Sequence, residues 1–314
     1  MTQTYTLDSA MQAYVEISQG FTAVDDSVAA RREAYLQACR ACTPTPPEGW
    51  RIDDIELDGL RLRRYKPEGE APQGGWPTML YIHGGGWDLG SLDTHDWFAY
   101  AMARRVQVAI VAVDYRLAPE HAYPAPLEDC LKAWHGLRQG QVDPDLSTGR
   151  LIVAGDSAGG TLAAGLCIAL RRDRHAQPLG QILIYPVLTT STHLPSMTEH
   201  AHAPLLTVAG LTKSLAGFLT NEEDRRDPCA MPLEDTDFTG LAPAFIGVAQ
   251  IDPLRDHGLA YRDALAADGV AVECYVAQGM VHSGLRAFGI EVVEVFYDRI
   301  GLQISAWLES DTLV

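Results

Sequence analysis

The stretch LIVAGDSAGGTLAA, residues 151–164, decides the fold of this chain. It begins with a short apolar run typical of a buried strand and ends in an Ala- and Leu-rich segment typical of a helix. Between them, Gly155-Asp156-Ser157-Ala158-Gly159 matches G-x-S-x-G, which places a serine on a tight strand-to-helix turn. Glycines avoid collisions there, and the N–H groups at the helix start favour developing negative charge. We interpret Ser157 as a nucleophile; the alternatives are a glycine-rich strand–helix turn without catalytic role and a phosphate-binding turn.

A second glycine-rich motif, HGGGW at residues 83–87, directly follows the apolar run 78–82. Acyl transfer generates an oxyanion, and closely approaching backbone N–H groups stabilise it. Consecutive glycines permit that approach. We therefore expect the N–H groups of Gly84, Gly85 and Ala158 to form an oxyanion hole, the alternative being a flexible glycine loop.

A nucleophilic serine needs a base, and the base needs a carboxylate to orient it. In a strand–turn–helix hydrolase the chain order is serine, acid, histidine. Asp252 follows the apolar run 244–248, and His282 follows the run 270–276, so we predict these two as acid and base. Asp256 is the rival acid. The other histidines after the serine are His175, His193, His200, His202 and His257.

The remaining pattern predicts an α/β fold with a mostly parallel sheet, because continuous apolar runs alternate with helical stretches. The predicted buried strands are 78–82, 108–113, 151–154, 182–185, 244–248 and 270–276. The predicted helices between them are 94–105, 125–138, 158–173, 257–268 and 289–309.

Three regions differ from this alternation. Residues 8–42 have a helical period, residues 52–65 alternate as a β-hairpin with its turn at Asp58-Gly59, and residues 187–240 are irregular, with a helical patch at 211–219. We interpret 187–240 as an insertion packed over the sheet.

The composition is that of an ordinary globular protein, with 47% hydrophobic and 21% charged residues. The net charge of −17 disfavours nucleic acid and anionic lipid surfaces as partners. No signal peptide or membrane-spanning run is recognisable, so we expect a cytoplasmic protein without membrane insertion. The six cysteines are expected to be free thiols, and the CxxC formed by Cys39 and Cys42 is a weak signal.

Four passages together resemble the hormone-sensitive-lipase-like family of α/β-hydrolases, in its bacterial esterase branch. They are the motif at residues 83–87, the passage DYRLAPEH at 114–121 with YPAP at 123–126, the motif GDSAGG at 155–160, and DPLRD at 252–256. The resemblance covers about residues 50–310. Three positions depart from the family pattern, namely Ser283-Gly284 after the histidine, Thr161 at the elbow and Met231 in DPCAMP.

This resemblance implies an eight-stranded sheet with helices on both faces and a helical cap. The cap would comprise residues 1–45 and 187–240, and the catalytic core would comprise 46–186 and 241–314. Ser157, Asp252 and His282 would form the triad, and the 114–121 passage would supply buried hydrogen bonds behind the site.

The expected activity is hydrolysis of short- to medium-chain carboxylic esters through an acyl-enzyme, without metal or cofactor. An amidase or deacetylase using the same triad remains open, as does a small-molecule receptor on a hydrolase scaffold, and a homodimer is neither indicated nor excluded. Five apolar residues are expected either as pocket walls or as ordinary core: Trp87, Trp97, Leu205, Leu206 and Phe218.

Overall fold

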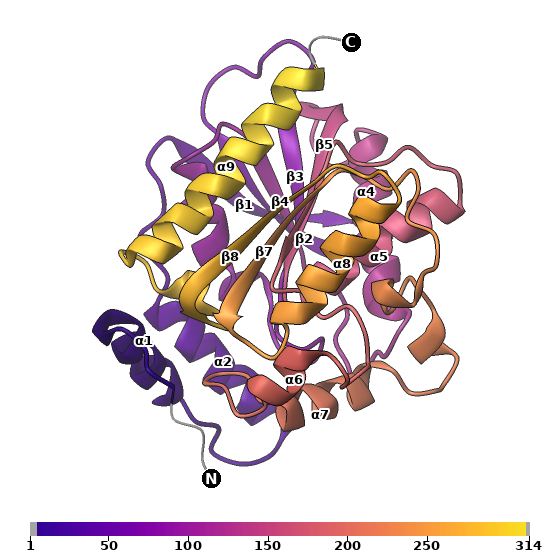
Figure 1. The fold of residues 1–314 in the computed structure, drawn as a ribbon. Coiled ribbons are helices and arrows are strands. Elements are labelled where there is room, and N and C mark those ends of the chain that lie inside the picture. Colours follow the sequence, from indigo (N-terminus) through magenta and orange to yellow (C-terminus); the bar gives the residue numbers. More distant parts are fainter. Residues whose placement is uncertain (1–4, 312–314) are drawn as a thin grey trace.

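The computed structural model describes residues 5–311, within which the strands form one eight-stranded sheet in the order β1-β2-β4-β3-β5-β6-β7-β8 (Figure 1). β1 pairs antiparallel with β2, and β2 antiparallel with β4; all other neighbours are parallel. The predicted fold class is therefore confirmed. The strands are β1 Trp50–Leu57, β2 Leu60–Pro67, β3 Trp76–Ile82, β4 Ala109–Val113, β5 Leu146–Asp156, β6 Gln181–Ile184, β7 Ala244–Ile251 and β8 Val272–Val281.

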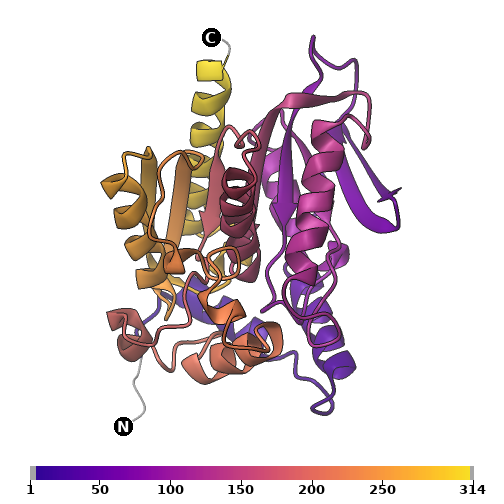
Figure 2. The same cartoon turned by 90° about the vertical axis from the view of Figure 1, so that its right-hand side faces the viewer.

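Helices cover both faces of the sheet, as the continuous apolar strands require (Figure 2). In β4 and β5, Val111 and Val153 belong to the hydrophobic cluster that includes α4, α5 and α8, whereas Ile110 and Ile152 belong to the cluster of α3 and α9. The helices are α1 Ser9–Gln19, α2 Val28–Ala41, α3 Asp96–Ala103, α4 Ala125–Arg138, α5 Ala158–Arg172, α6 Pro195–Glu199, α7 Val208–Phe218, α8 Arg255–Ala267 and α9 Glu291–Asp311. Short 3-10 turns span Leu92–Thr94, Asp224–Arg226, Pro232–Glu234 and Gly284–Arg286.

The hairpin prediction is confirmed, and its turn has the expected backbone. Leu57 pairs with Leu60 across Asp58 and Gly59, whose φ angles are 46° and 82°. A two-residue hairpin turn of this kind needs positive φ angles at both residues, because its twist then matches the twist of the flanking strands.

The helical pattern at 8–42 corresponds to two helices, α1 and α2. The first helix ends at Gly20, and the second begins after Ser27, whose Oγ accepts the N–H of Ala30 at 3.1 Å. A serine cap satisfies backbone donors that an uninterrupted helix would pair internally. The helical period alone did not reveal this break.

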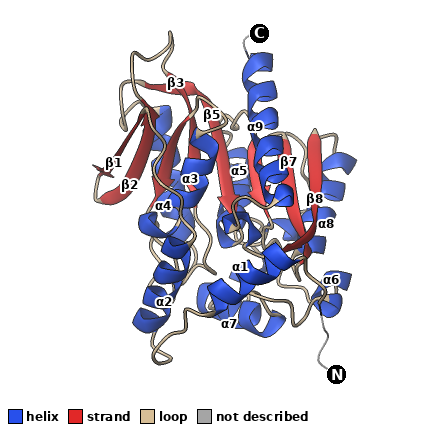
Figure 3. Ribbon diagram, turned by 90° about the vertical axis from the view of Figure 1, so that its left-hand side faces the viewer, coloured by secondary structure: helices blue, strands red, loops and turns tan. Residues whose placement is uncertain are grey.

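The N-terminal helices lie with α6 and α7 at one end of the sheet, below the strand ends that carry the elbow (Figures 1 and 3). The Tyr14 hydroxyl of α1 donates to the carbonyl of Ser283 at 2.7 Å. Arginines of α2 reach loops of the core through three ion pairs, namely Arg31–Asp88, Arg32–Glu120 and Arg40–Asp93. The beginning of the chain is thus fastened to the loops around the elbow.

None of the helices within residues 5–311 combines the length and the apolar character needed to cross a membrane. All six cysteines are free, as predicted. Cys39, near the end of α2, is buried with its Sγ 2.9 Å from Nη1 of Arg286.

Candidate active site

Ser157 lies on the turn between β5 and α5 with φ 54° and ψ −118°. The turn is tight enough to require glycine on both sides of the serine. A Cβ on Gly155 would lie 2.2 Å from the carbonyl oxygen of Gly159, and a Cβ on Gly159 would lie 2.0 Å from that of Ile82. The motif therefore exists because β3, β5 and α5 approach each other closely at this point.

The structure brings Ser157, His282 and Asp252 together. Ser157 Oγ is 3.0 Å from His282 Nε2, and His282 Nδ1 is 2.7 Å from Asp252 Oδ2. The histidine directly follows β8 and the aspartate directly follows β7, so adjacent parallel strands deliver both side chains to the same edge. All three residues are buried. The geometry is that of a nucleophile, a base and an orienting carboxylate.

Asp256, the rival acid, contacts a different part of the chain. Its Oδ2 accepts the N–H of Ser196 at 2.8 Å, and its Oδ1 pairs with Arg255 at 2.8 Å. Asp256 therefore joins α8 to α6, whereas the carboxylate of Asp252 contacts the histidine and the N–H of Leu254.

The expected oxyanion hole needs one correction. The N–H of Gly84 donates to the carboxylate of Asp156 at 2.9 Å and is not available to a substrate. Among the described residues, no acceptor is found for the N–H groups of Gly85 and Gly86, and both residues line the cavity beside Ser157. The N–H of Ala158 opens α5, where helix geometry leaves it without an internal partner. Gly86 thus replaces Gly84 among the available donors.

Asp156, the residue before the serine, has a buried carboxylate that the serine motif alone does not explain. It accepts the Tyr81 hydroxyl at 2.7 Å as well as the Gly84 N–H, and His95 Nε2 lies 3.6 Å away. Burial opposes its ionisation, but His95 and these hydrogen bonds outweigh burial and lower the pKa of Asp156. A charged Asp156 therefore fixes the glycine loop against the elbow.

Hydrogen bonds behind the site match what the family resemblance implied for residues 114–121. The Tyr115 hydroxyl donates to the carbonyl of His83 at 2.9 Å, and the Tyr115 ring stacks on the His83 ring at 4.3 Å. Arg116 pairs with Asp129 of α4 at 2.9 Å. This passage holds the loop that begins at His83.

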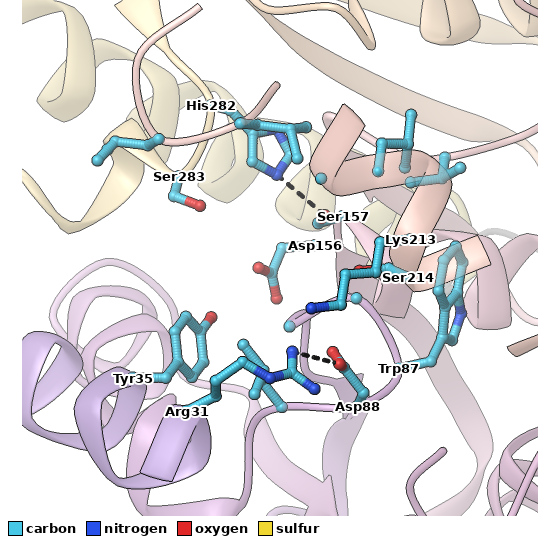
Figure 4. A pocket seen from close by; sticks show the side chains of 18 residues that line it. Arg31, Tyr35, Trp87, Asp88, Asp156, Ser157, Lys213, Ser214, His282 and Ser283 are labelled. Carbon is cyan, nitrogen blue, oxygen red and sulfur yellow. Dashed lines mark hydrogen bonds and ion pairs between the residues drawn. The ribbon is translucent and has the colours of Figure 1, made fainter. Parts of the chain in front are cut away.

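A cavity of about 290 Å³ opens beside Ser157 (Figure 4). Of the apolar residues expected as walls, Trp87, Leu205 and Leu206 line it. For the other two the ordinary-core alternative holds: Trp97 packs against Phe98, and Phe218 stacks on Trp87 with ring centroids 4.3 Å apart. Sequence reasoning missed the polar part of the wall, which includes Arg31, Tyr35, Asp88, Asp156, Lys213 and Ser214.

The departures from the family pattern are accommodated locally. Ser283 adopts a φ of 61° and lines the cavity, where Tyr35 of α2 supplies an aromatic side chain (Figure 4). Thr161 donates its hydroxyl to the carbonyl of Val187 at 2.5 Å, and Met231 is fully buried.

The other histidines do not contact the serine. His175, His193 and His202 are exposed, and His200 lies beside Arg255. His257 is fully buried on α8, where its Nδ1 accepts the N–H of Leu188 at 3.1 Å. Burial lowers the pKa of His257 to about 4, so the folded protein keeps this ring neutral.

His257 should therefore make the stability of the protein depend on pH. Because an unfolded histidine titrates near pH 6.5, the unfolded chain takes up a proton between about pH 6.5 and 4 that the folded chain refuses, and stability falls as the pH falls through this window. Between pH 7 and pH 5 the titration of His257 should lower the free energy of unfolding by about 2 kcal/mol. In His257→Asn, whose amide oxygen keeps the acceptor, urea unfolding should show a correspondingly smaller pH dependence.

The matched control is His193→Asn, which replaces an exposed histidine and should behave as the wild type. An equal loss of stability between pH 7 and pH 5 in the wild type and His257→Asn would refute the role assigned to His257.

Comparisons with known proteins agree with this geometry. The model of a family described as having the alpha/beta hydrolase fold matches residues 79–286. Esterase LipI of Mycobacterium tuberculosis is 41% identical over 277 residues, which cover 85% of this chain and 84% of that protein. Ethyl acetate hydrolase of Pseudomonas putida is 37% identical over 241 residues, covering 75% and 76%. The solved structure of LAE6, an alpha/beta hydrolase from the Lake Arreo metagenome, superposes with a TM-score of 0.87 at 30% identity over 96% of this chain and 98% of that one.

The chain therefore belongs to the alpha/beta hydrolase fold family.

Proposed function

We propose that this protein is a serine carboxylesterase that hydrolyses short- to medium-chain esters through an acyl-enzyme. The carrying observation is the unbroken chain of contacts from Ser157 through His282 to Asp252, with distances of 3.0 Å and 2.7 Å. Its relatives support the reaction class, since proteins named as esterase and ethyl acetate hydrolase are 41% and 37% identical to it over 277 and 241 aligned residues.

In the proposed mechanism, His282 removes the proton of Ser157 as the Oγ attacks the ester carbonyl. The N–H groups of Gly85, Gly86 and Ala158 stabilise the oxyanion, and the protonated His282 then gives its proton to the departing alcohol. Water attacks the acyl-enzyme by the same route and releases the acid. Asp252 keeps the proton on Nδ1 of the imidazole and stabilises its charged form.

We further propose that α1, α2 and residues 187–240 act together as the cap that limits the substrate. Support comes from the cavity walls, because Arg31 and Tyr35 come from α2 whereas Leu205 and Lys213 come from the 187–240 stretch. A cavity of about 290 Å³ lies at the small end of the range for ligand pockets, which favours short acyl groups over long ones.

The test is a kcat/KM profile on p-nitrophenyl esters with acyl chains of two to sixteen carbons, with the 4-nitroanilide of the best acyl group alongside. We expect the maximum between about two and eight carbons and a far slower anilide. Faster cleavage of the anilide would instead support the amidase alternative, and tight binding of esters without turnover would support a receptor.

A further inference from the structure

Cationic side chains gather around the cavity beside Ser157. Arg31 and Lys213 line this cavity, and a second cavity of about 310 Å³ is lined by Arg31 and Arg286. The two cavities share Arg31, Tyr35 and Ser283 in their walls, so they adjoin each other and Arg31 stands at their junction.

Lys213 differs from the other two lysines of the chain. Lys66 forms an ion pair with Asp143 at 3.1 Å, and Lys132 donates to the carbonyl of Asp58 at 2.5 Å. Within residues 5–311, no ion pair or hydrogen bond is found for Lys213. Its ammonium group extends over the cavity toward Arg31 and Asp88 (Figure 4). The charge thus faces the space that a substrate would occupy.

Arg31 is only partly satisfied by its neighbours. Its Nη1 contacts Asp88 at 2.7 Å, but its Nε is buried and has no hydrogen-bond partner among the described residues. A buried donor without an acceptor is costly, so the ion pair with Asp88 satisfies the guanidinium only in part.

Arg286 adds a third cation in the second cavity. Its side chain is only 6% exposed, and no carboxylate pairs with it in the described part of the chain. Its contacts include the thiol of Cys39 at 2.9 Å, the ring of Tyr35 at 5.6 Å and the side chain of Tyr14. The wall of the second cavity therefore carries two guanidinium groups and no carboxylate.

The carboxylates of the first cavity do not balance these charges. Asp88 pairs with Arg31, and Asp156 already accepts from Tyr81 and Gly84. Three cations thus face two carboxylates in a chain whose net charge is −17. A local positive field within an acidic protein attracts an anion to one place.

We propose that this site selects esters that carry a carboxylate group, held at the junction of the two cavities by Arg31 and Lys213. This inference rests on the proposed esterase function and names its substrate class. The carboxylate would accept charge-assisted hydrogen bonds from the guanidinium of Arg31 and the ammonium of Lys213, while the field of Arg286 favours it from the second cavity.

The test compares two esters of equal acyl length, the p-nitrophenyl monoester of glutaric acid and p-nitrophenyl valerate. The measured quantity is kcat/KM for the charged ester divided by kcat/KM for the neutral ester. The intrinsic reactivities of the two esters are the same for every variant, so they cancel when the ratio of a variant is compared with that of the wild type. Lys213→Met and Arg31→Gln should each lower this ratio about fivefold, mainly through the KM of the charged ester, and added salt should lower it in the wild type.

Two further variants separate local charge from other effects. Asp88→Asn breaks the same ion pair as Arg31→Gln but removes a negative charge, so the ratio should rise. Lys132→Met removes an equal charge from a partly buried position on α4 that lines neither cavity, so the ratio should stay at the wild-type value.

A second ester pair, 4-acetoxybenzoate and 4-tolyl acetate, places the carboxylate on the alcohol side instead. A dependence on Arg31 and Lys213 in either pair supports the proposal and tells which side of the ester meets the cations. Ratios unchanged by both variants in both pairs would overturn it, although Ser157-dependent hydrolysis of the neutral esters would leave the esterase function standing. Absence of neutral-ester hydrolysis by the wild type would instead overturn the function itself.

Discussion

Replacing Ser157 by alanine is expected to lower kcat for p-nitrophenyl butyrate by about 10⁵-fold while the protein stays folded. The loss should be this large because the variant has no nucleophile, although the oxyanion donors and the cavity remain. Rates are measured with enough protein to detect the residual activity, and folding is checked by thermal unfolding. A fluorophosphonate probe should add one covalent group to the wild type and none to the variant.

The matched control is Ser310→Ala, at the exposed end of α9, which should keep full activity and full labelling. If the folded Ser157→Ala variant kept more than about a hundredth of the wild-type rate, another residue would have to be the nucleophile.

Asp252→Asn should lower kcat by about 10⁴-fold. The asparagine can occupy the same buried space, but it cannot stabilise the charged imidazole, and its amide favours the tautomer in which Nε2 carries the proton. Nε2 faces Ser157 at 3.0 Å and must be free to accept the serine proton. The rate is followed from pH 5 to pH 10, because loss of the carboxylate should persist across the whole profile.

Asp256→Asn provides the comparison, since the two aspartates lie four residues apart. Asp256 joins α8 to Ser196 and does not touch His282, so its replacement should change kcat by less than about threefold. Equal losses in the two variants would contradict the assignment of Asp252 as the orienting acid.

The strands and the ends that carry Ser157, Asp252 and His282 were predictable because each depends on a local pattern. A buried parallel strand is a short apolar run, and the residue that follows it must lie at the edge of the sheet. The order of serine, acid and histidine then limited the candidates, and contacts across 125 and 30 residues joined them as predicted.

Features that depend on which distant side chains meet were not predictable. The sequence His-Gly-Gly-Gly at residues 83–86 does not reveal which N–H groups are free. In the structure Asp156 accepts the N–H of Gly84, whereas that of Gly86 stays available. The sequence leaves open whether Trp97 and Phe218 are pocket walls or core, and their packing decides it: Trp97 packs against Phe98, and Phe218 stacks on Trp87. Arg31 reaches the serine cavity only because α2 packs against the loop at Asp88, 57 residues away.

The fastening of α2 to the core has a consequence for protein engineering. Arg31 and Tyr35 lie outside the segment, residues 79–286, that the family model matches, yet both form walls of the cavity. Part of the cavity wall is thus contributed by a segment that is separate in sequence from the residues of the proposed triad. Exchanging residues 9–41 between homologues, with the anchoring partners Asp88 and Glu120 retained, offers a route to altered substrate range that leaves the reaction centre intact.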